Sequence, residues 1–185
     1  MQDRILVLGH IMTTVSGPPR ARAPGARSLD WPALLADATA EFQARASANP
    51  FGVDDDWWSR QQEWTAAQHN TLTDDEFLRI MSRSATWLEF EQLLRVLREL
   101  EAKPLILSMP FYAPYMAHQG VSPAAYRQYY ARVQALADQY GARTVIFDDH
   151  ESDRFFFHDL WSHISPRGWV YFHQALDAFY HDTLR

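Results

Sequence analysis

Two side chains near the end of the sequence could together do acid–base chemistry. Asp159 and His163 stand four residues apart, in a stretch dense in acids, histidines and aromatics. A histidine held by a carboxylate is a tuned general base, because the carboxylate sets the tautomer and stabilises the imidazolium that forms. A loop with this spacing can aim both side chains at one point. We therefore predict that Asp159 and His163 are the acid–base half of a hydrolase-like triad.

Such a triad needs a nucleophile within hydrogen-bond reach of the histidine. The sequence has no cysteine, which excludes thiol catalysis, and it has neither a Gly-x-Ser-x-Gly elbow nor Gly-Asp-Ser. Ser108 follows a predicted strand and is the best internal candidate, but Met109 and Pro110 are not the small neighbours that expose a nucleophile. Ser108 is instead predicted to satisfy backbone groups of its loop. The nucleophile is predicted to lie outside this chain.

The same stretch allows two other interpretations. Its imidazoles and carboxylates suit zinc or a similar ion, although their spacing fits no standard ligand motif. The candidate ligands are His150, Asp153, His158, Asp159 and His163. In the second interpretation, the loop is structural and docks a partner protein through its aromatic side chains. The favoured interpretation needs no metal and no cofactor.

Composition places the chain among ordinary globular proteins. The 185 residues are 47% hydrophobic and 22% charged, which suits one domain with a buried core. The formal net charge of −6 and the lack of a basic stripe argue against nucleic acid as a partner. No run approaches the roughly 20 apolar residues of a spanning helix. Residues 1–14 lack a small-residue cleavage site, so no signal peptide is predicted.

The elements around the acid–base pair follow a helix–strand–helix–strand–loop–helix order. Right-handed crossovers would make this a parallel α/β unit, with the Asp159–His163 loop after its second strand. The carboxyl end of a parallel strand is where open α/β sheets place their sites. The predicted elements are a helix over 86–102, a strand over 104–107, a loop over 108–115, a helix from Ser122-Pro123 to Gly141, a strand over 143–147 and a helix from Ser165-Pro166.

The helical faces are predicted from apolar spacing. The helix over 86–102 should bury Trp87, Phe90, Leu94 and Leu97, with Leu93 and Leu100 widening the stripe. The last helix should bury Trp169, Val170, His173, Leu176, Phe179 and Tyr180.

The first half of the sequence is read mainly from helix-start signals. Asp30 should cap a helix over 31–46, and Thr73 with Glu76 forms a capping box that opens a helix through Met81. Residues 4–12 are an apolar strand or helix, and 16–28 are a Pro-, Gly- and Arg-rich loop. We divide the chain into an irregular segment, 1–30, and an α/β region, 31–185. Since only two strands are convincing, either the first half supplies more or the chain is part of a larger domain.

Three stretches resemble the carboxy-terminal half of the DltD family of D-alanyl-lipoteichoic acid biosynthesis proteins. Residues 47–55 are similar to an Asn-Pro-Phe-Gly-hydrophobic-Asp segment, and 102–108 to an Ala-Lys-Pro-Leu strand entry. Residues 156–180, from Phe-Phe-His-Asp through Gly-Trp-Val-Tyr, resemble the closing segment of the family and are the most specific match. The likeness covers residues 31–180.

The resemblance implies an SGNH-hydrolase-like, that is flavodoxin-like, parallel sheet with flanking helices, here a partial domain without its amino-terminal strands. It implies an O-acyltransferase or esterase with an acyl-serine mechanism, in which His163 is the base and Asp159 its orienting acid. The serine and the oxyanion glycine would lie in an upstream half absent from this chain. The alternative is a non-catalytic domain that docks a carrier protein or an envelope polymer.

The resemblance also implies a pathway and a compartment. The family takes part in D-alanylation of teichoic acid at the outer side of the bacterial membrane. A D-alanyl carrier protein, the membrane acyltransferase of the same pathway and a teichoic acid-like polymer are the implied partners.

One departure from the family motif concerns the acid. The family has Asp-x-x-His, whereas three residues separate Asp159 from His163, and Leu160 stands at the expected acid position. Either a one-residue bulge restores the geometry or Asp153 serves instead. His163 through Gly168 matches the wider SGNH pattern of His-hydrophobic-Ser-x-x-Gly.

Overall fold

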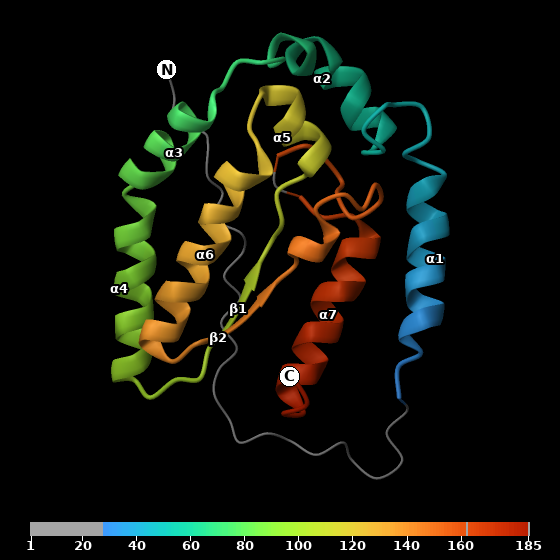
Figure 1. Cartoon of the computed structure of the whole chain (residues 1–185). Helices are drawn as coiled ribbons and strands as arrows, with labels where there is room; N and C mark the ends of the chain where they lie inside the picture. The colour runs from blue at the N-terminus through green and yellow to red at the C-terminus, as the bar shows by residue number, and fades with distance from the viewer. Residues whose placement is uncertain (1–27, 162, 185) are drawn as a thin grey trace. The chain divides into compact units, whose positions relative to one another are not determined.

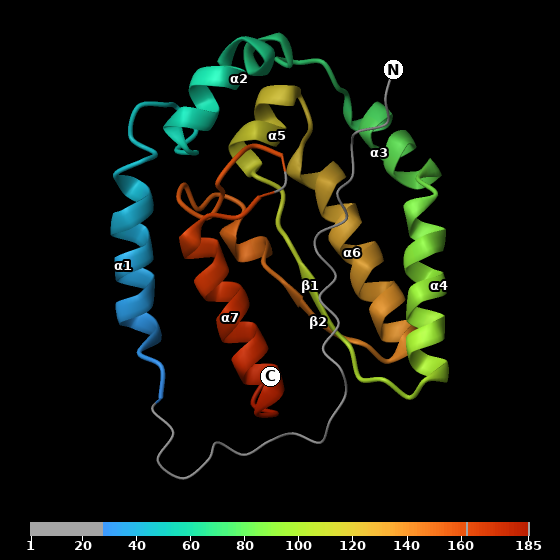
Figure 2. The ribbon, with the colours of Figure 1, turned by 180° about the vertical axis from the view of Figure 1, so that it is seen from behind.

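The computed structural model describes residues 28–161 and 163–184 and shows an α/β protein (Figures 1 and 2). The described residues form two compact units, one of 64–152 and the other of 28–63 together with 153–184. The predicted segment 4–12, and all of 16–28 except its last residue, lie outside the described residues. The division predicted at residue 30 therefore stays a prediction.

The unit of residues 64–152 is built on two parallel strands. β1 (Leu105–Ser108) and β2 (Arg143–Ile146) pair residue for residue along their whole length, and every residue of β1 is buried. α6 (Pro123–Tyr140) connects the strands and packs on both. Within the described part of the chain this pair is the only sheet. The predicted parallel α/β unit is confirmed in this small form.

Three further helices complete this unit, together with the carboxyl end of α2 (Asp55–Ala67). They are α3 (Asp74–Arg83), α4 (Thr86–Glu99) and α5 (Ala113–Gln119). α3 and α4 pack on α6, which lies between them and the strands (Figures 1 and 2). Aromatic side chains of α6 form much of the buried core, because its tyrosines recur at helical spacing. Among the described residues, no helix is long and apolar enough to cross a membrane.

The predicted helix starts in this unit are confirmed. Thr73 and Glu76 form the capping box of α3, and Ser122 caps α6, which ends at Gly141 in the left-handed region. The hydroxyl and the backbone N–H of Ser122 also donate to Asp74, at 2.6 and 2.7 Å. These hydrogen bonds lower the pKa of Asp74 and join the first turns of α3 and α6.

Two predictions in this unit were wrong. Trp87, Phe90 and Leu94 are buried in α4, but Leu93 and Leu100 are 37% and 70% exposed, because α6 covers α4 along a narrow stripe only. The loop predicted over 108–115 ends early, because α5 begins at residue 113. The sequence contains the signals of α5, namely Pro114 in its first turn and Gly120 as its C-cap.

Buried polar groups hold the loops at the carboxyl ends of the strands. Glu151 is 4% exposed, receives two hydrogen bonds from Arg127, at 2.7 and 3.2 Å, and accepts another from the Tyr126 hydroxyl at 3.1 Å. Burial and the nearby Glu151 charge raise the pKa of Tyr126 to about 12. The Tyr130 hydroxyl accepts from the Phe111 N–H at 2.6 Å. Side chains of α6 therefore fix both loops.

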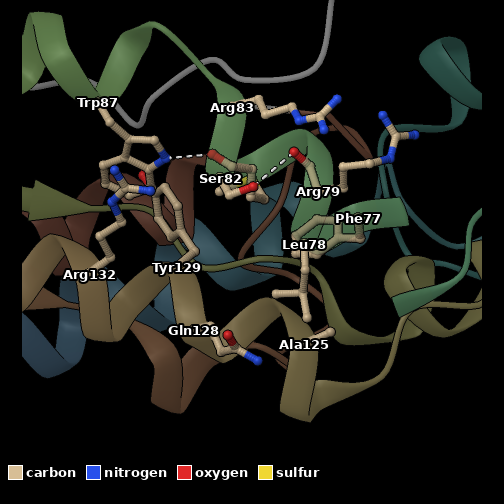
Figure 3. A pocket seen from close by; sticks show the side chains of 11 residues that line it. Phe77, Leu78, Arg79, Ser82, Arg83, Trp87, Ala125, Gln128, Tyr129 and Arg132 are labelled. Atoms are coloured by element: carbon tan, nitrogen blue, oxygen red, sulfur yellow. Dashed lines mark hydrogen bonds between the residues drawn. The ribbon is translucent and has the colours of Figure 1, made fainter. Parts of the chain in front are cut away.

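The surface of the same unit is hollowed beside α3 and α6. The pocket has a volume of about 420 Å³, and Trp87, Tyr129 and Arg132 are among its lining residues (Figure 3).

The second unit, 28–63 with 153–184, packs α1 (Trp31–Gln43) against α7 (Pro166–Tyr180). Asp30 caps α1 as predicted and accepts from the Ala33 N–H at 3.1 Å. The helix ends three residues before the predicted end at residue 46.

The apolar face predicted for the last helix was wrong in part, since only Val170, Leu176 and Phe179 of the six residues are half-buried. α7 buries Gly168, Phe172 and Ala175, while Trp169 and Tyr180 are 39% and 49% exposed. The prediction placed the large apolar side chains on the covered face, whereas that face of α7 is made mostly of small residues that let other segments approach closely.

Candidate functional site

A tight backbone loop in the second unit carries the predicted acid–base pair. Its two sides meet through an antiparallel bridge between Phe157 and Ile164. The His158 N–H donates to the His163 carbonyl at 2.9 Å, and the Ser165 N–H donates to the Phe156 carbonyl at 2.9 Å. These contacts close the loop immediately before α7. Phe156 and Phe157 anchor it, because both rings are almost fully buried.

Asp159 and His163 meet across this loop. Asp159 Oδ2 lies 2.5 Å from His163 Nδ1, and Asp159 is buried, with only 2% of its surface exposed. Its Oδ1 accepts from the backbone N–H groups of Trp161, at 2.8 Å, and His163, at 3.2 Å. An ionised carboxylate can only accept, so in the neutral imidazole Nδ1 carries the hydrogen of this bond and Nε2 has the lone pair.

The imidazole itself faces outward. The side chain of His163 is 62% exposed, while that of Asp159 is only 3% exposed. Among the described residues, His163 Nε2 makes no hydrogen bond. The arrangement is a buried acid orienting an accessible base, which is what general-base chemistry on an external hydroxyl requires.

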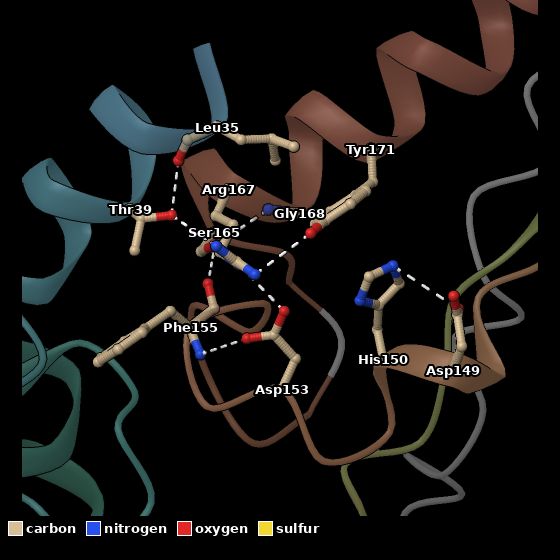
Figure 4. A network of polar contacts seen from close by, with 10 residues as sticks. All are labelled: Leu35, Thr39, Asp149, His150, Asp153, Phe155, Ser165, Arg167, Gly168 and Tyr171. Carbon is tan, nitrogen blue, oxygen red and sulfur yellow. Dashed lines mark hydrogen bonds and ion pairs between the residues drawn. The ribbon is translucent and has the colours of Figure 1, made fainter. Parts of the chain in front are cut away.

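Asp153, the alternative acid, has a different partner. Its Oδ2 lies 3.0 Å from Arg167 Nε, and its Oδ1 accepts from the Phe155 N–H at 3.2 Å (Figure 4). The sequence left Asp153 and Asp159 open as partners of His163, and the structure pairs the histidine with Asp159.

Arg167 joins three segments of the second unit. Besides Asp153, its guanidinium donates to Thr39 Oγ1 in α1, at 2.7 Å, and to the Tyr171 hydroxyl in α7, at 3.2 Å (Figure 4). Arg167 lies within the His163–Gly168 pattern, but the sequence alone indicated no role for it. An arginine in the first turn of a helix opposes the helix dipole, which is a signal that a specific anionic partner holds it.

The start of α7 leaves no spare room beside the loop. Ser165 caps the helix by accepting from the Gly168 N–H at 3.2 Å, and its hydroxyl donates to the Phe155 carbonyl. A Cβ on Gly168 would lie 2.6 Å from the Phe156 carbonyl oxygen and 2.9 Å from the Ile164 Cβ. Glycine is therefore required where the helix passes the backbone of the loop.

A second loop of this unit, residues 49–55, supports the first. The Asp54 N–H donates to the His158 carbonyl at 2.9 Å. The Asp54 side chain accepts from the Trp57 N–H, at 3.0 Å, as an N-cap of α2, and from Arg45 at 2.7 Å. Burial raises the pKa of Asp54, but these hydrogen bonds outweigh it and leave the pKa below its usual value.

Asn49 and Gly52 shape this supporting loop. The Asn49 amide donates to the Val53 carbonyl, at 2.6 Å, and to Asp55 Oδ1, at 2.7 Å. Gly52 has φ +68°, and a Cβ there would meet the Arg154 side chain, whose guanidinium donates to the Asn49 carbonyl at 3.0 Å. The Asn-Pro-Phe-Gly segment is thus a structural brace for the segment that carries the acid–base pair.

The candidate metal ligands do not gather at one point. Asp159 bonds His163, Asp153 bonds Arg167, and His150 lies 3.6 Å from Asp149 in the other unit. Within residues 28–161 and 163–184, no three His, Cys, Asp or Glu side chains are arranged to hold a metal ion.

Ser108 does not have the structural role predicted for it. Its hydroxyl is buried and has no hydrogen-bond partner among the described residues, so the prediction that it satisfies loop backbone groups was wrong. Burial also keeps this oxygen from an external acyl group. Among the described residues, no serine hydroxyl bonds His163.

Comparison with known proteins assigns the family. Residues 6–181 match the family model described as DltD protein. The chain is also similar to Protein DltD of Bacillus subtilis (strain 168), with 25% identity over 173 residues that cover 94% of this chain and 43% of the relative. The chain therefore spans less than half the length of that relative. With the match extending over nearly all of its residues, this chain belongs to the DltD family.

Proposed function

We propose that this chain carries the acid–base pair of a DltD-type serine acyltransferase or esterase. The reaction is D-alanylation of teichoic acid or of a related envelope polymer, and the nucleophilic serine comes from outside these 185 residues. The contact that carries the proposal is the 2.5 Å pair between buried Asp159 and exposed His163. Membership of the DltD family supplies the substrate class.

The geometry suits a two-step acyl transfer. Nε2 of His163 takes the proton of the serine hydroxyl as the serine oxygen attacks the acyl carbonyl carbon. The imidazolium, stabilised by Asp159, then gives this proton to the leaving group, and an acyl-serine ester remains. In the second step, Nε2 takes the proton of an acceptor hydroxyl, which attacks the ester. The serine recovers its proton, and oxyanion donors hold the charge of both tetrahedral intermediates.

The proposal includes an SGNH-hydrolase-like fold for the complete domain. Two parallel strands joined by a helix, and a histidine in the loop before the last helix, are consistent with it. It also includes action at the outer side of the bacterial membrane. The proposed partners are a D-alanyl carrier protein, the membrane acyltransferase of the same pathway and the acceptor polymer.

Exposed tryptophans favour a second candidate, a docking domain without chemistry of its own. Trp161 and Trp169 are 50% and 39% exposed, and the Trp161 ring meets the edge of Trp57 at 5.4 Å. Braced aromatic side chains of this kind are common anchors at interfaces. They could hold a carrier protein or an envelope polymer.

Replacing the base tests the proposal against docking. In the full-length protein, His163→Ala should lower acyl transfer about 10³-fold or more, because Nε2 is the only proposed proton acceptor. D-alanyl ester formed on the polymer would be measured, together with the melting temperature. His173→Ala, another exposed histidine of the same unit, is the matched control and should retain activity.

Two results would decide between the candidates. Full acyl transfer by a folded His163→Ala variant would end the catalytic proposal. Loss of transfer in Trp161→Ala alone, with His163→Ala active, would favour docking.

A further inference from the structure

The pocket beside α3 and α6 lies in the unit of residues 64–152 and has no part in the proposed acyl transfer. Its volume of about 420 Å³ is within the range of small-ligand sites. α3, the start of α4 and α6 supply its lining, which consists of Phe77, Leu78, Arg79, Met81, Ser82, Arg83, Trp87, Ala125, Gln128, Tyr129 and Arg132 (Figure 3).

The charge of this lining is opposite to that of the chain. The chain has 17 lysines and arginines against 23 acids, yet three arginines and no acid line the pocket. Among the described residues, Arg79, Arg83 and Arg132 form no ion pair with a carboxylate. The Glu76 carboxylate acts on Arg79 only at longer range. The pocket therefore offers three guanidinium groups that make no salt bridge with a described carboxylate.

Arg132 is held in place by its ring contact rather than by an acid. Its guanidinium carbon lies 4.3 Å from the centre of the Trp87 ring, a cation–π contact. Trp87 is fixed by a 2.8 Å hydrogen bond from Nε1 to the Met81 carbonyl and by the Tyr129 ring at 5.4 Å. Stacking uses the face of the guanidinium and leaves its N–H edge for an oxyanion.

Apolar and aromatic side chains form much of the remaining lining. Phe77, Met81, Trp87 and Tyr129 are all buried members of the core of this unit, and their surfaces form the wall beside Arg132. A guanidinium next to an aromatic wall suits a ligand that combines an oxyanion with an apolar group.

We propose that this pocket binds a phosphate ester that carries an apolar group, with Arg132 bonding the phosphate and Trp87 and Tyr129 contacting the apolar part. Arg79 and Arg83 add positive potential from α3. A phosphate fits better than a carboxylate, because its second negative charge gains more from the positive potential of Arg79 and Arg83. The source of the ester is either a soluble molecule or a lipid headgroup.

Binding of phenyl phosphate to the full-length protein tests the site. Calorimetric titration should show tighter binding of phenyl phosphate than of inorganic phosphate or phenol alone, since only the ester uses both parts of the pocket. Arg132→Ala should weaken binding about tenfold or more, and Arg132→Lys should restore it only in part. Arg95→Ala, at an exposed arginine of α4 outside the pocket, is the matched control and should bind as the wild type does.

Vesicles distinguish the two sources of the ester. Binding to vesicles that contain phosphatidic acid, but not to pure phosphatidylcholine, with the same loss in Arg132→Ala, would identify a lipid headgroup. Absence of binding to both phenyl phosphate and phosphatidic acid would overturn the proposal, as would wild-type binding by a folded Arg132→Ala variant. Equal affinity for inorganic phosphate and phenyl phosphate would contradict the proposed contact of Trp87 and Tyr129 with an apolar group of the ligand. His163→Ala should bind as the wild type does, so this site and the proposed acyl transfer succeed or fail separately.

Discussion

At the scale of the residue, Asp159 explains how a four-residue spacing forms the acid–base pair. Its Oδ1 accepts from the Trp161 N–H two residues ahead, so the side chain turns the backbone back on itself. The turn buries Leu160, leaves Trp161 half exposed and brings the His163 ring onto Oδ2. The turn therefore accommodates the extra residue relative to the Asp-x-x-His motif, and Asp159 is the carboxylate that bonds His163.

Arg167 is the residue that we expect to position this loop. Lysine in its place keeps the charge but cannot reproduce three directed hydrogen bonds, to Asp153, Thr39 and Tyr171. Arg167→Lys should lower the kcat of the proposed acyl transfer by the full-length protein about tenfold with little change in KM, because the base is misplaced while substrate contacts remain.

The control for Arg167 removes one of its three hydrogen bonds. Tyr171→Phe lacks the hydroxyl that accepts the 3.2 Å bond from Arg167, and it should reduce kcat less than Arg167→Lys does. Steady-state kinetics check both variants. A rise in KM at constant kcat would contradict a positioning role.

At the scale of the element, the loop of residues 156–165 and the first turn of α7 are held together by hydrogen bonds and close packing. Ser165 belongs to both, since its backbone N–H bonds the Phe156 carbonyl and its hydroxyl caps the helix. Gly168 allows the two to touch. Orientation of His163 thus depends on the packing of α7 as much as on the residues of the loop.

Gly168→Ala should separate the loop from the helix. The new Cβ would overlap the Phe156 carbonyl oxygen, so we expect a loss of about 1–3 kcal/mol in the free energy of unfolding. Acyl transfer should fall as well, because the Phe156 backbone forms one side of the loop that carries His163. Gly141→Ala has open space but φ +71°, and it should cost only about 1 kcal/mol without affecting activity. Denaturant unfolding and activity measure both, and a neutral Gly168→Ala would contradict the close-packing account.

At the scale of the whole molecule, ionisable groups of both units limit the pH range of the fold. Hydrogen bonds from Ser122 lower the pKa of Asp74 in one unit. In the other unit, the pKa of Asp54 is lowered although burial alone would raise it. The pKa of Asp55 is also lowered, because hydrogen bonds from Asn49 and from backbone N–H groups outweigh desolvation. A lowered folded pKa means that the stabilisation is complete above the unfolded value of 3.8 and is lost as pH falls through the folded value.

Stability should therefore fall steeply below about pH 4. Asp54→Asn should be less stable than the wild type at neutral pH, with a shallower acid limb, and the two curves should converge at the lowest pH. Urea unfolding across pH would measure this. On the alkaline side, Tyr126, with its pKa raised to about 12, adds stability that is complete below pH 10 and is lost as pH rises toward 12. Parallel acid limbs in wild type and Asp54→Asn would contradict the role of Asp54.

Local signals in the sequence determined most of the helices and their ends. The caps of Asp30, Thr73, Ser122 and Ser165 all lie where their residue types predict, because capping is settled by side-chain oxygens within three residues. Both strands were also predicted from short apolar runs between helices. The nearness of His163 to an acid followed from residue types in one short loop.

The tertiary structure decided what depends on distant segments. The contact that occupies Asp153 joins it to Arg167, 14 residues away, and no local pattern predicts that contact. Small residues make up most of the covered face of α7 because α1 and the Phe156 backbone approach there, and Leu100 is exposed because α6 covers only part of α4. Residue types and one local turn therefore brought Asp159 and His163 together, while a contact between residues farther apart in the sequence removed Asp153 as the alternative acid.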